Sequence, residues 1–328
     1  MNHRLATIII VFTLVIAAIF SVVIKQKKLE KLDITSNVKE VTQNSKLIDM
    51  NLDHNQALDV IDYAKRKNIK VPKILINFDT HSDIFINADI LKYKESDVSS
   101  WINNLLASNP QINTIYWVMP MEEAKNIDLM TIFGAYGGEL PDEEAFILFG
   151  NISDKKTNEF TFLFKPLYKK AYKQEFYFDP KTGKMNAIPE KKENLKKLFN
   201  TDESNLRKIE VITCTENTLP NLKGQDVFLS IDADYISNSG FDTYNDFKFF
   251  KRNEHEINAT FYSIFDTLKK KEIKPTIISL SLSPRYLPKQ YQSFVDITFK
   301  YITLTANKFD MIDKYKNRYV EEQEEAGY

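Results

Sequence analysis

Glycine and cysteine are both scarce in this chain of 328 residues, which contains eight glycines and one cysteine. The chain has no glycine-rich loop to cradle a nucleotide phosphate, which argues against P-loop and dinucleotide-binding proteins. The single cysteine, Cys214, cannot form a disulfide within the chain and cannot build a thiolate zinc cluster. It lies in an apolar run, residues 209–214, and is predicted to be a buried strand residue rather than a nucleophile.

The chain also lacks a net charge of consequence, because 44 Lys and Arg residues face 45 Asp and Glu residues and the net charge is −1. Such a balance gives no electrostatic reason to expect nucleic acid or an anionic membrane surface as a partner. The length suits one large α/β domain or two small ones.

One long apolar run is present, in residues 5–24, with lysines after it. As a helix it would span about 30 Å, the thickness of a bilayer core. No small-residue cleavage site follows, so we expect residues 1–30 to be an uncleaved membrane anchor that tethers a domain outside the cytoplasm. One alternative is a cleaved signal and a secreted protein. Another is the opposite orientation, with the domain in the cytoplasm, which the lysines after the apolar run favour. Residues 31–45 are charged and polar and are predicted to be a linker.

Apolar strand-like runs alternate with amphipathic helical patterns through residues 46–310. This order predicts a three-layer α/β domain, with a mostly parallel sheet and helices on both faces. Residues 144–187 are rich in aromatic side chains and are predicted to be an antiparallel insertion, with a turn at residues 179–183. Residues 311–328 are predicted to be a polar tail.

Side chains of metal-ligand type follow one of the apolar runs, in the stretch 73–83, which reads KILINFDTHSD. Its apolar part suits a strand buried on both faces of a parallel sheet. Asp79, His81 and Asp83 then occupy every second position, and alternate residues of an extended chain point to the same side. We therefore expect them to converge at the carboxyl end of a strand, where open α/β sheets bind ligands. The alternative is a polar loop with an aspartate that caps the next helix.

A second apolar run also ends in acids two positions apart, because residues 227–234 read VFLSIDAD and place Asp232 and Asp234 at a strand end. Crowded carboxylates repel one another and their pKa values rise. A divalent ion removes that penalty. Two strands that end in this way favour a bound cation.

A third motif, Asp53-His54, stands at the start of a predicted helix, and His54 lies 25 residues before Asp79. In residue type and order, the set resembles the arginase/ureohydrolase superfamily, which shares its fold with the zinc histone deacetylases. Residues 116–120 (YWVMP), Leu219-Pro220 and residues 230–235 (SIDADY) are similar to an uncharacterised family within that superfamily.

The resemblance implies a site for two divalent metal ions, bridged by Asp79 and Asp232. One ion would be bound by His54, Asp79, Asp83 and Asp232, and the other by Asp79, His81, Asp232 and Asp234. Ligands of oxygen and imidazole nitrogen without thiolate suit Mn²⁺, with Zn²⁺ or Fe²⁺ as alternatives.

The expected activity is hydrolysis of a C–N bond, of amide or amidine type, in a small molecule by a hydroxide bound to both metals. It is not that of an arginase, because Ser281 stands where the resemblance would place a substrate-binding glutamate. His255 is the candidate proton donor, and Ser281 and Arg285 are candidates for the pocket; Arg285 would suit an anionic substrate. The alternative for His255, which the residues themselves favour, is a surface position at a helix start.

Two other classes of function remain open. One is a membrane-tethered domain of the same fold that binds metal without catalysis. The other is an interaction domain without metal, which fails if the six ligand residues come within about 4–5 Å of one point, as a shared bimetallic site requires.

Overall fold

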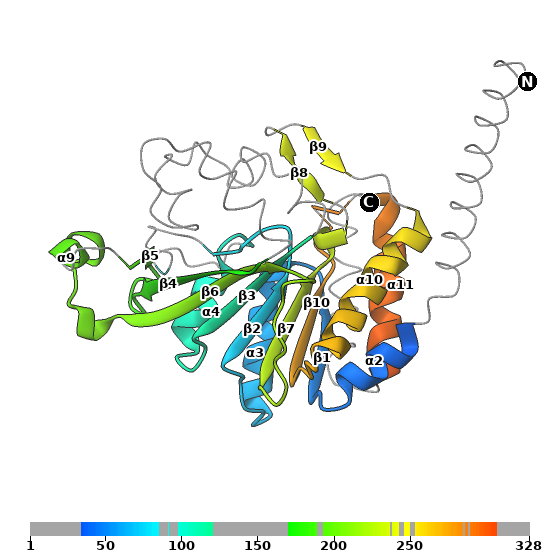
Figure 1. Cartoon of the computed structure of the whole chain (residues 1–328), viewed down its shortest axis with the longest axis horizontal. Coiled ribbons are helices and arrows are strands. Elements are labelled where there is room, and N and C mark those ends of the chain that lie inside the picture. Colours follow the sequence, from blue (N-terminus) through cyan, green and yellow to red (C-terminus); the bar gives the residue numbers. More distant parts are fainter. Residues whose placement is uncertain are drawn as a thin grey trace, which may run out of the picture.

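A single large sheet dominates the computed structural model, which describes residues 34–84, 91, 98–120, 170–188, 193–236, 238–242, 246–249, 253–284, 286–287 and 289–306 (Figure 1). Its strands, in spatial order, are β1 (Leu47–Asn51), β10 (Ile277–Ser281), β7 (Val227–Asp232), β2 (Ile74–Phe78), β3 (Thr114–Met119), β6 (Arg207–Thr215), β4 (Tyr172–Phe178) and β5 (Met185–Ala187). The first six pair in parallel, whereas β4 runs antiparallel to both β6 and β5.

Helices cover both faces of this sheet. On one face lie α3 (Ala57–Arg66) and α4 (Trp101–Ser108), and on the other lie α2 (Ile34–Thr42), α10 (Glu254–Lys270) and α11 (Lys289–Ala306). Successive strand residues face opposite cores, so that Leu75 packs with α3 and α4 whereas Ile76 packs with α10 and α11. Burial on both faces explains the nearly continuous apolar runs, and the predicted α/β class is confirmed.

The predicted antiparallel insertion is described only from residue 170 onward. There β4 and β5 form a hairpin, and Asp179 N–H donates to the Lys184 carbonyl at 2.9 Å. Gly183 has a φ of 70° in this turn, a conformation that glycine adopts without strain. The turn at residues 179–183 is therefore confirmed, and residues 144–169 lie outside the described part of the chain.

The described part of the chain also contains a helix before β6 and a second, smaller sheet. Helix α9 (Glu193–Phe199) precedes β6, and a two-stranded antiparallel sheet is formed by β8 (Asn238–Asp242) and β9 (Asp246–Phe249). The strands β8 and β9 follow the carboxyl end of β7, on the side of the main sheet where the candidate site lies.

The predicted linker, residues 31–45, is wrong for residues 34–42, which form α2. Val38 and Val41 lie on one face of this helix and are buried. They belong to the core that α10 and α11 share. The helix was not predicted because the composition of this stretch is polar. Two valines three positions apart are nevertheless enough to bury one face of a short helix.

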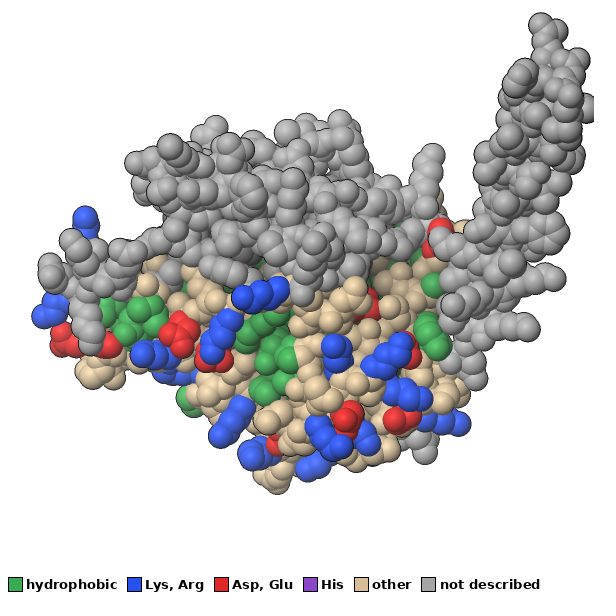
Figure 2. All heavy atoms as spheres, viewed as in Figure 1, with side chains coloured by type: hydrophobic (Ala, Val, Ile, Leu, Met, Phe, Trp, Pro, Cys, Tyr) green, Lys and Arg blue, Asp and Glu red, His purple; other side chains and the backbone are tan. Residues whose placement is uncertain are grey.

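None of the helices in the described ranges is long and apolar enough to cross a membrane. The predicted anchor, residues 5–24, and the predicted tail, residues 311–328, lie outside those ranges. Where Figure 2 colours the surface, Lys and Arg side chains are interspersed with Asp and Glu side chains, in keeping with the balanced charge of the chain.

The strands β2 and β7 are neighbours in the sheet, and the connections that follow them go to opposite faces of it. After β2 the chain passes through α4 on one face to β3, whereas after β7 it passes through α10 on the other face to β10. Loops that leave adjacent parallel strands in opposite directions open a crevice between them, and open α/β sheets bind their ligands there.

Candidate metal centre

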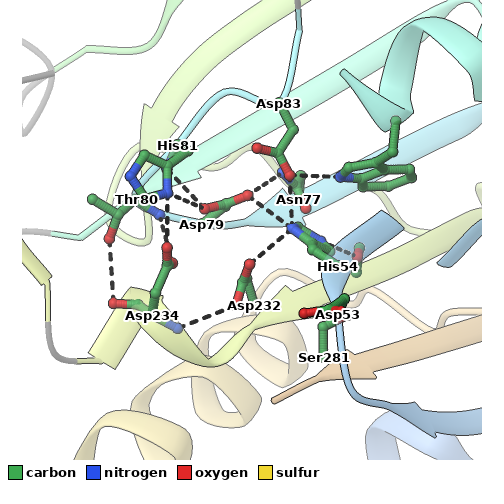
Figure 3. Close-up of polar contacts among 12 residues, drawn as sticks. Asp53, His54, Asn77, Asp79, Thr80, His81, Asp83, Asp232, Asp234 and Ser281 are labelled. Carbon is green, nitrogen blue, oxygen red and sulfur yellow. Dashed lines mark hydrogen bonds and ion pairs between the residues drawn. The ribbon is translucent and has the colours of Figure 1, made fainter. Parts of the chain in front are cut away.

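The six predicted ligand residues lie together at this crevice (Figure 3). His54 begins the short helix η1 (His54–Gln56) just after β1, and Asp79, His81 and Asp83 follow β2. Asp232 ends β7, and Asp234 lies in the short helix η5 (Ala233–Ile236). Ligand atoms of His54, Asp79 and Asp232 lie within 4.8 Å of one another, as do those of Asp79, His81 and Asp234. These two groups are compatible with metal binding, which an interaction domain without metal would not need.

Three carboxylate oxygens surround one nitrogen in the first of these groups, the His54 group. His54 Nδ1 lies 3.1 Å from Asp79 Oδ2, 2.8 Å from Asp83 Oδ2 and 3.0 Å from Asp232 Oδ2. Donors about 2.1 Å from one ion, at right angles to each other, are about 3 Å apart. A single proton on Nδ1 could serve only one of the three oxygens, so the spacing suits a cation better than a hydrogen bond.

The second group, the His81 group, shares Asp79 with the first. His81 Nδ1 lies 2.7 Å from Asp234 Oδ2 and 3.6 Å from Asp79 Oδ1. Asp234 Oδ2 is buried and accepts no hydrogen bond from the described residues. Asp79 thus presents Oδ2 to one group and Oδ1 to the other, which is the geometry of a bridging carboxylate.

Asp232, unlike Asp79, has an ion pair with only one histidine among the described residues. Its Oδ2 faces His54, while its Oδ1 accepts the Asp234 N–H at 3.2 Å. The structure therefore places Asp232 in the His54 group, and the predicted second bridge stays untested.

Side chains other than the six predicted ligands hold those ligands in place. His54 Nε2 lies 2.8 Å from Ser230 Oγ, and Asn77 Nδ2 donates to Asp79 Oδ2 at 3.1 Å. Trp101 Nε1 donates to Asp83 Oδ2 at 2.6 Å. Ser230 and Asn77 each precede a ligand by two positions in a strand, so the alternation of side chains could have identified them. No comparable signal marks Trp101 in the sequence.

The two imidazoles carry extra affinity for protons. Burial alone would lower the pKa of His54, but the carboxylates of Asp232 and Asp83 raise it well above its usual value. Burial likewise opposes protonation of His81, and Asp234 outweighs it, so that this pKa is also raised. Both histidines therefore favour the charged form while no other cation balances the carboxylates.

The pKa values of the carboxyl groups in the site shift in opposite directions. Burial and the charge of Asp79 raise the pKa of Asp83 to about 7. Burial, followed by Asp232 and Asp79, raises the pKa of Asp234 well above its usual value. Burial would also raise the pKa of Asp79, but hydrogen bonds from His54 and His81 hold it well below its usual range. Protons thus supply the positive charge that a metal ion would otherwise bring.

Solvent reaches this site unevenly. The His81 side chain is 13% exposed, whereas the side chain of His54 is 2% exposed and that of Asp83 is 7% exposed. The Tyr286 ring lies beside His81, with a centroid separation of 5.7 Å. Among the described residues, the His81 side is therefore the more open side.

The other predicted site residues are placed differently. Ser281 is buried at the end of β10 and donates to Asn51 Oδ1 at 2.6 Å. His255 is exposed in the first turn of α10. No hydrogen bond or ion pair within the described ranges joins Ser281 or His255 to the six ligand residues, and their predicted roles stay predictions. Arg285 lies outside the described residues.

Comparison with known proteins adds no family to this geometry. No family model matches the chain, and no curated protein matches it. The structure alone therefore supports a buried group of His and Asp side chains that could bind metal.

Proposed function

We propose that this chain is a metal-dependent hydrolase of the arginase/ureohydrolase type that cleaves an amide or amidine C–N bond with two divalent ions. The observation that carries the proposal is the position of Asp79, which offers one oxygen to the His54 group and the other to the His81 group. Once bound, two such ions would acidify a water molecule and polarise the substrate.

Charge balance supports two ions rather than one. Four aspartates surround the site, namely Asp79, Asp83, Asp232 and Asp234. As carboxylates they carry four negative charges, which equal the charge of two divalent cations. Buried carboxylates in this number need compensation, since an isolated buried charge is costly.

The donor set favours Mn²⁺, with Zn²⁺ or Fe²⁺ as alternatives. It consists of imidazole nitrogen and carboxylate oxygen, and the only cysteine, Cys214, lies in β6 away from these residues. Burial raises the pKa of the Cys214 thiol, so the thiolate form that a metal needs is disfavoured.

The substrate is proposed to differ from a guanidinium compound. Ser281 offers no negative charge, and its hydroxyl is used in a hydrogen bond to Asn51. A cationic substrate would therefore lack a carboxylate partner at this position. Arg285 as a contact for an anionic substrate, and His255 as the proton donor to the leaving nitrogen, complete the proposal.

Elemental analysis of the purified full-length chain tests the metal content. We expect about two Mn, Zn or Fe atoms per chain, and their loss in the variant Asp79→Ala/Asp232→Ala. A matched control is Asp62→Ala/Asp202→Ala, which removes two exposed carboxylates and should keep both ions. Absence of bound metal in the unaltered protein, even after reloading with Mn²⁺, would refute the proposal.

A metal-binding domain without catalysis is the second candidate, and the burial of the ligands favours it. Asp79 and Asp234 have no exposed side-chain surface. A screen of amides and amidines with the Mn²⁺-loaded protein separates the two candidates. Turnover that disappears in Asp79→Ala/Asp232→Ala supports the hydrolase, whereas full metal content without turnover supports the binding domain.

We further propose that residues 5–24 anchor the chain in a membrane, with the folded domain on the side away from the cytoplasm. Lysines at 25, 27 and 28 follow the apolar run. The full-length chain should stay in the membrane pellet after alkaline carbonate extraction, and protease added outside sealed cells should degrade the domain. Recovery of a shortened chain in the medium would instead support the cleaved, secreted form.

A further inference from the structure

Trp101 contacts two of the proposed metal ligands at once. It is the first residue of α4, and its side chain is completely buried. The indole Nε1 donates a hydrogen bond to Asp83 Oδ2 at 2.6 Å, and the indole and His54 rings have centroids 4.8 Å apart. One side chain thus restrains a ligand that follows β1 and a ligand that follows β2.

The oxygen that Trp101 binds is the oxygen that faces the His54 group. Asp83 Oδ2 also lies 2.8 Å from His54 Nδ1. A hydrogen bond to a carboxylate is stronger than one between neutral groups, so it limits rotation of the Asp83 side chain. The Asp83 backbone has a φ of 52°, which is uncommon outside glycine. Such a conformation persists only where the surroundings fix it, and the indole is one such restraint.

The second tryptophan of the chain makes a different kind of contact. Trp117 lies in β3, is fully buried, and its Nε1 donates to the main-chain oxygen of Asp79 at 3.0 Å. That bond restrains the loop and leaves the Asp79 carboxylate oxygens free of the indole. The chain has only two tryptophans. One donates to a side-chain oxygen of a proposed ligand and the other to a main-chain oxygen, so variants of the two can distinguish these kinds of support.

We propose that Trp101 is a positioning residue for the ion of the His54 group. Its N–H turns Asp83 Oδ2 towards His54 Nδ1, and its ring fixes the plane of the imidazole. The inference rests on the proposed two-ion function and adds a residue that is not itself a ligand. No contact within the described ranges joins Trp101 to His81 or Asp234, so it acts on one ion position and not on the other.

The first test compares Trp101→Phe with Trp117→Phe in the full-length chain. Both variants keep an aromatic ring and lose one indole N–H. Supporting contacts of metal ligands contribute about 10- to 100-fold to metal affinity. Calorimetric titration with Mn²⁺ should show that loss for one ion of two in Trp101→Phe, whereas Trp117→Phe, which loses a bond to the Asp79 main chain, should not weaken one ion more than the other. Elemental analysis after dialysis should find about one ion per chain in the first variant and about two in the second.

The outcomes separate this inference from the proposed function. If the unaltered protein binds no metal, the proposed function fails. If it binds two ions and Trp101→Phe binds both with unchanged affinity, or loses both equally, only the role of Trp101 is overturned.

A spectroscopic measurement covers the case in which Trp101→Phe does not fold. In Trp117→Phe the sole indole is Trp101, and Co²⁺ quenches indole fluorescence at short range. We expect quenching to saturate with one ion, and Asp83→Asn in the same background to weaken it. Binding of Co²⁺ without quenching, or quenching that Asp83→Asn leaves unchanged, would overturn the inference.

Discussion

At the scale of single residues, His54 is oriented by a buried serine on another strand. His54 Nε2 lies 2.8 Å from Ser230 Oγ, and Ser230 belongs to β7. A proton on Nε2 that is donated to this hydroxyl leaves the lone pair on Nδ1, the atom that faces the three carboxylates. Ser230 Oγ can accept that proton, and this tautomer of His54 is the one that could bind a metal ion through Nδ1.

Ser230→Ala should lower the affinity of the His54 group for Mn²⁺ by about 10-fold or more, because the tautomer and the ring orientation are no longer fixed. Calorimetric titration of the full-length protein measures this change. Ser279→Ala is the matched control, since Ser279 is equally buried, pairs with Ser230 across β10 and β7, and binds Asn51 instead of a ligand. Equal affinities in the two variants would contradict the role of Ser230.

The clustering of the six candidate ligands could be predicted from their types and spacing, but the backbone that brings them together could not. Alternation assumes an extended chain, whereas β2 ends at Phe78. A turn follows, in which Asp79 Oδ1 accepts the His81 N–H at 2.7 Å and Asp83 has a left-handed φ of 52°. No glycine or proline marks this turn, so the spacing predicted that these side chains cluster but assumed the wrong local structure.

At the scale of elements, strands were easier to recognise than short polar helices. All six residues of β7 are buried, and a strand covered on both faces shows a continuous apolar run. The helix α2 contains only two buried apolar residues, Val38 and Val41, in nine. Its helical state depends on packing against α10 and α11, which the local sequence does not reveal.

The position of α2 predicts where the folded domain begins. A chain shortened to begin at residue 31 should unfold at the same temperature as the full-length protein, whereas one shortened to begin at residue 46 should lose α2 and unfold at a lower temperature. Thermal denaturation followed by circular dichroism measures both. Equal stability of the two shortened chains would show that residues 34–42 are a linker after all.

Point substitutions test the same packing without truncation. Val38→Ala/Val41→Ala should destabilise the protein by about 3 kcal/mol, at about 0.8 kcal/mol for each buried CH₂ group lost. Chemical denaturation provides the free energy of unfolding. Lys39→Ala is the control on the exposed side of α2 and should change little, so a similar loss in that variant would show that the effect does not come from the buried valines.

At the scale of the whole molecule, the sheet brings charge of one sign into a nearly neutral protein. The net charge is −1, yet the four aspartates of the site meet in one crevice because β2 and β7 are neighbours in a parallel sheet. Their mutual repulsion is part of the free energy of folding. The stability of the protein should therefore depend on what neutralises them, whether protons or metal ions.

The sign of this dependence follows from the raised pKa values. In the ion-free protein Asp83 holds its proton up to a pKa of about 7, far above the usual pKa of an aspartate, and the pKa values of His54, His81 and Asp234 are also raised. The folded state then binds more protons than the unfolded state. The stabilising effect of the Asp83 proton is full at acidic pH and is lost as the pH rises through about 7, and the effects of the other three groups are lost as the pH rises through their own raised pKa values. The lowered pKa of Asp79 acts only at more acidic pH.

Bound metal should reverse this trend, because it displaces these protons and binds more tightly as they leave. The difference in Tm between Mn²⁺-loaded and EDTA-treated protein should therefore increase from about pH 5.5 to about pH 8. Asp79→Ala/Asp232→Ala should show almost no such difference at any pH, which separates the site from general effects of the ion. A difference that stays constant across this range in the unaltered protein would mean that protons and metal do not compete for these carboxylates, and that the buried acids are neutralised in another way.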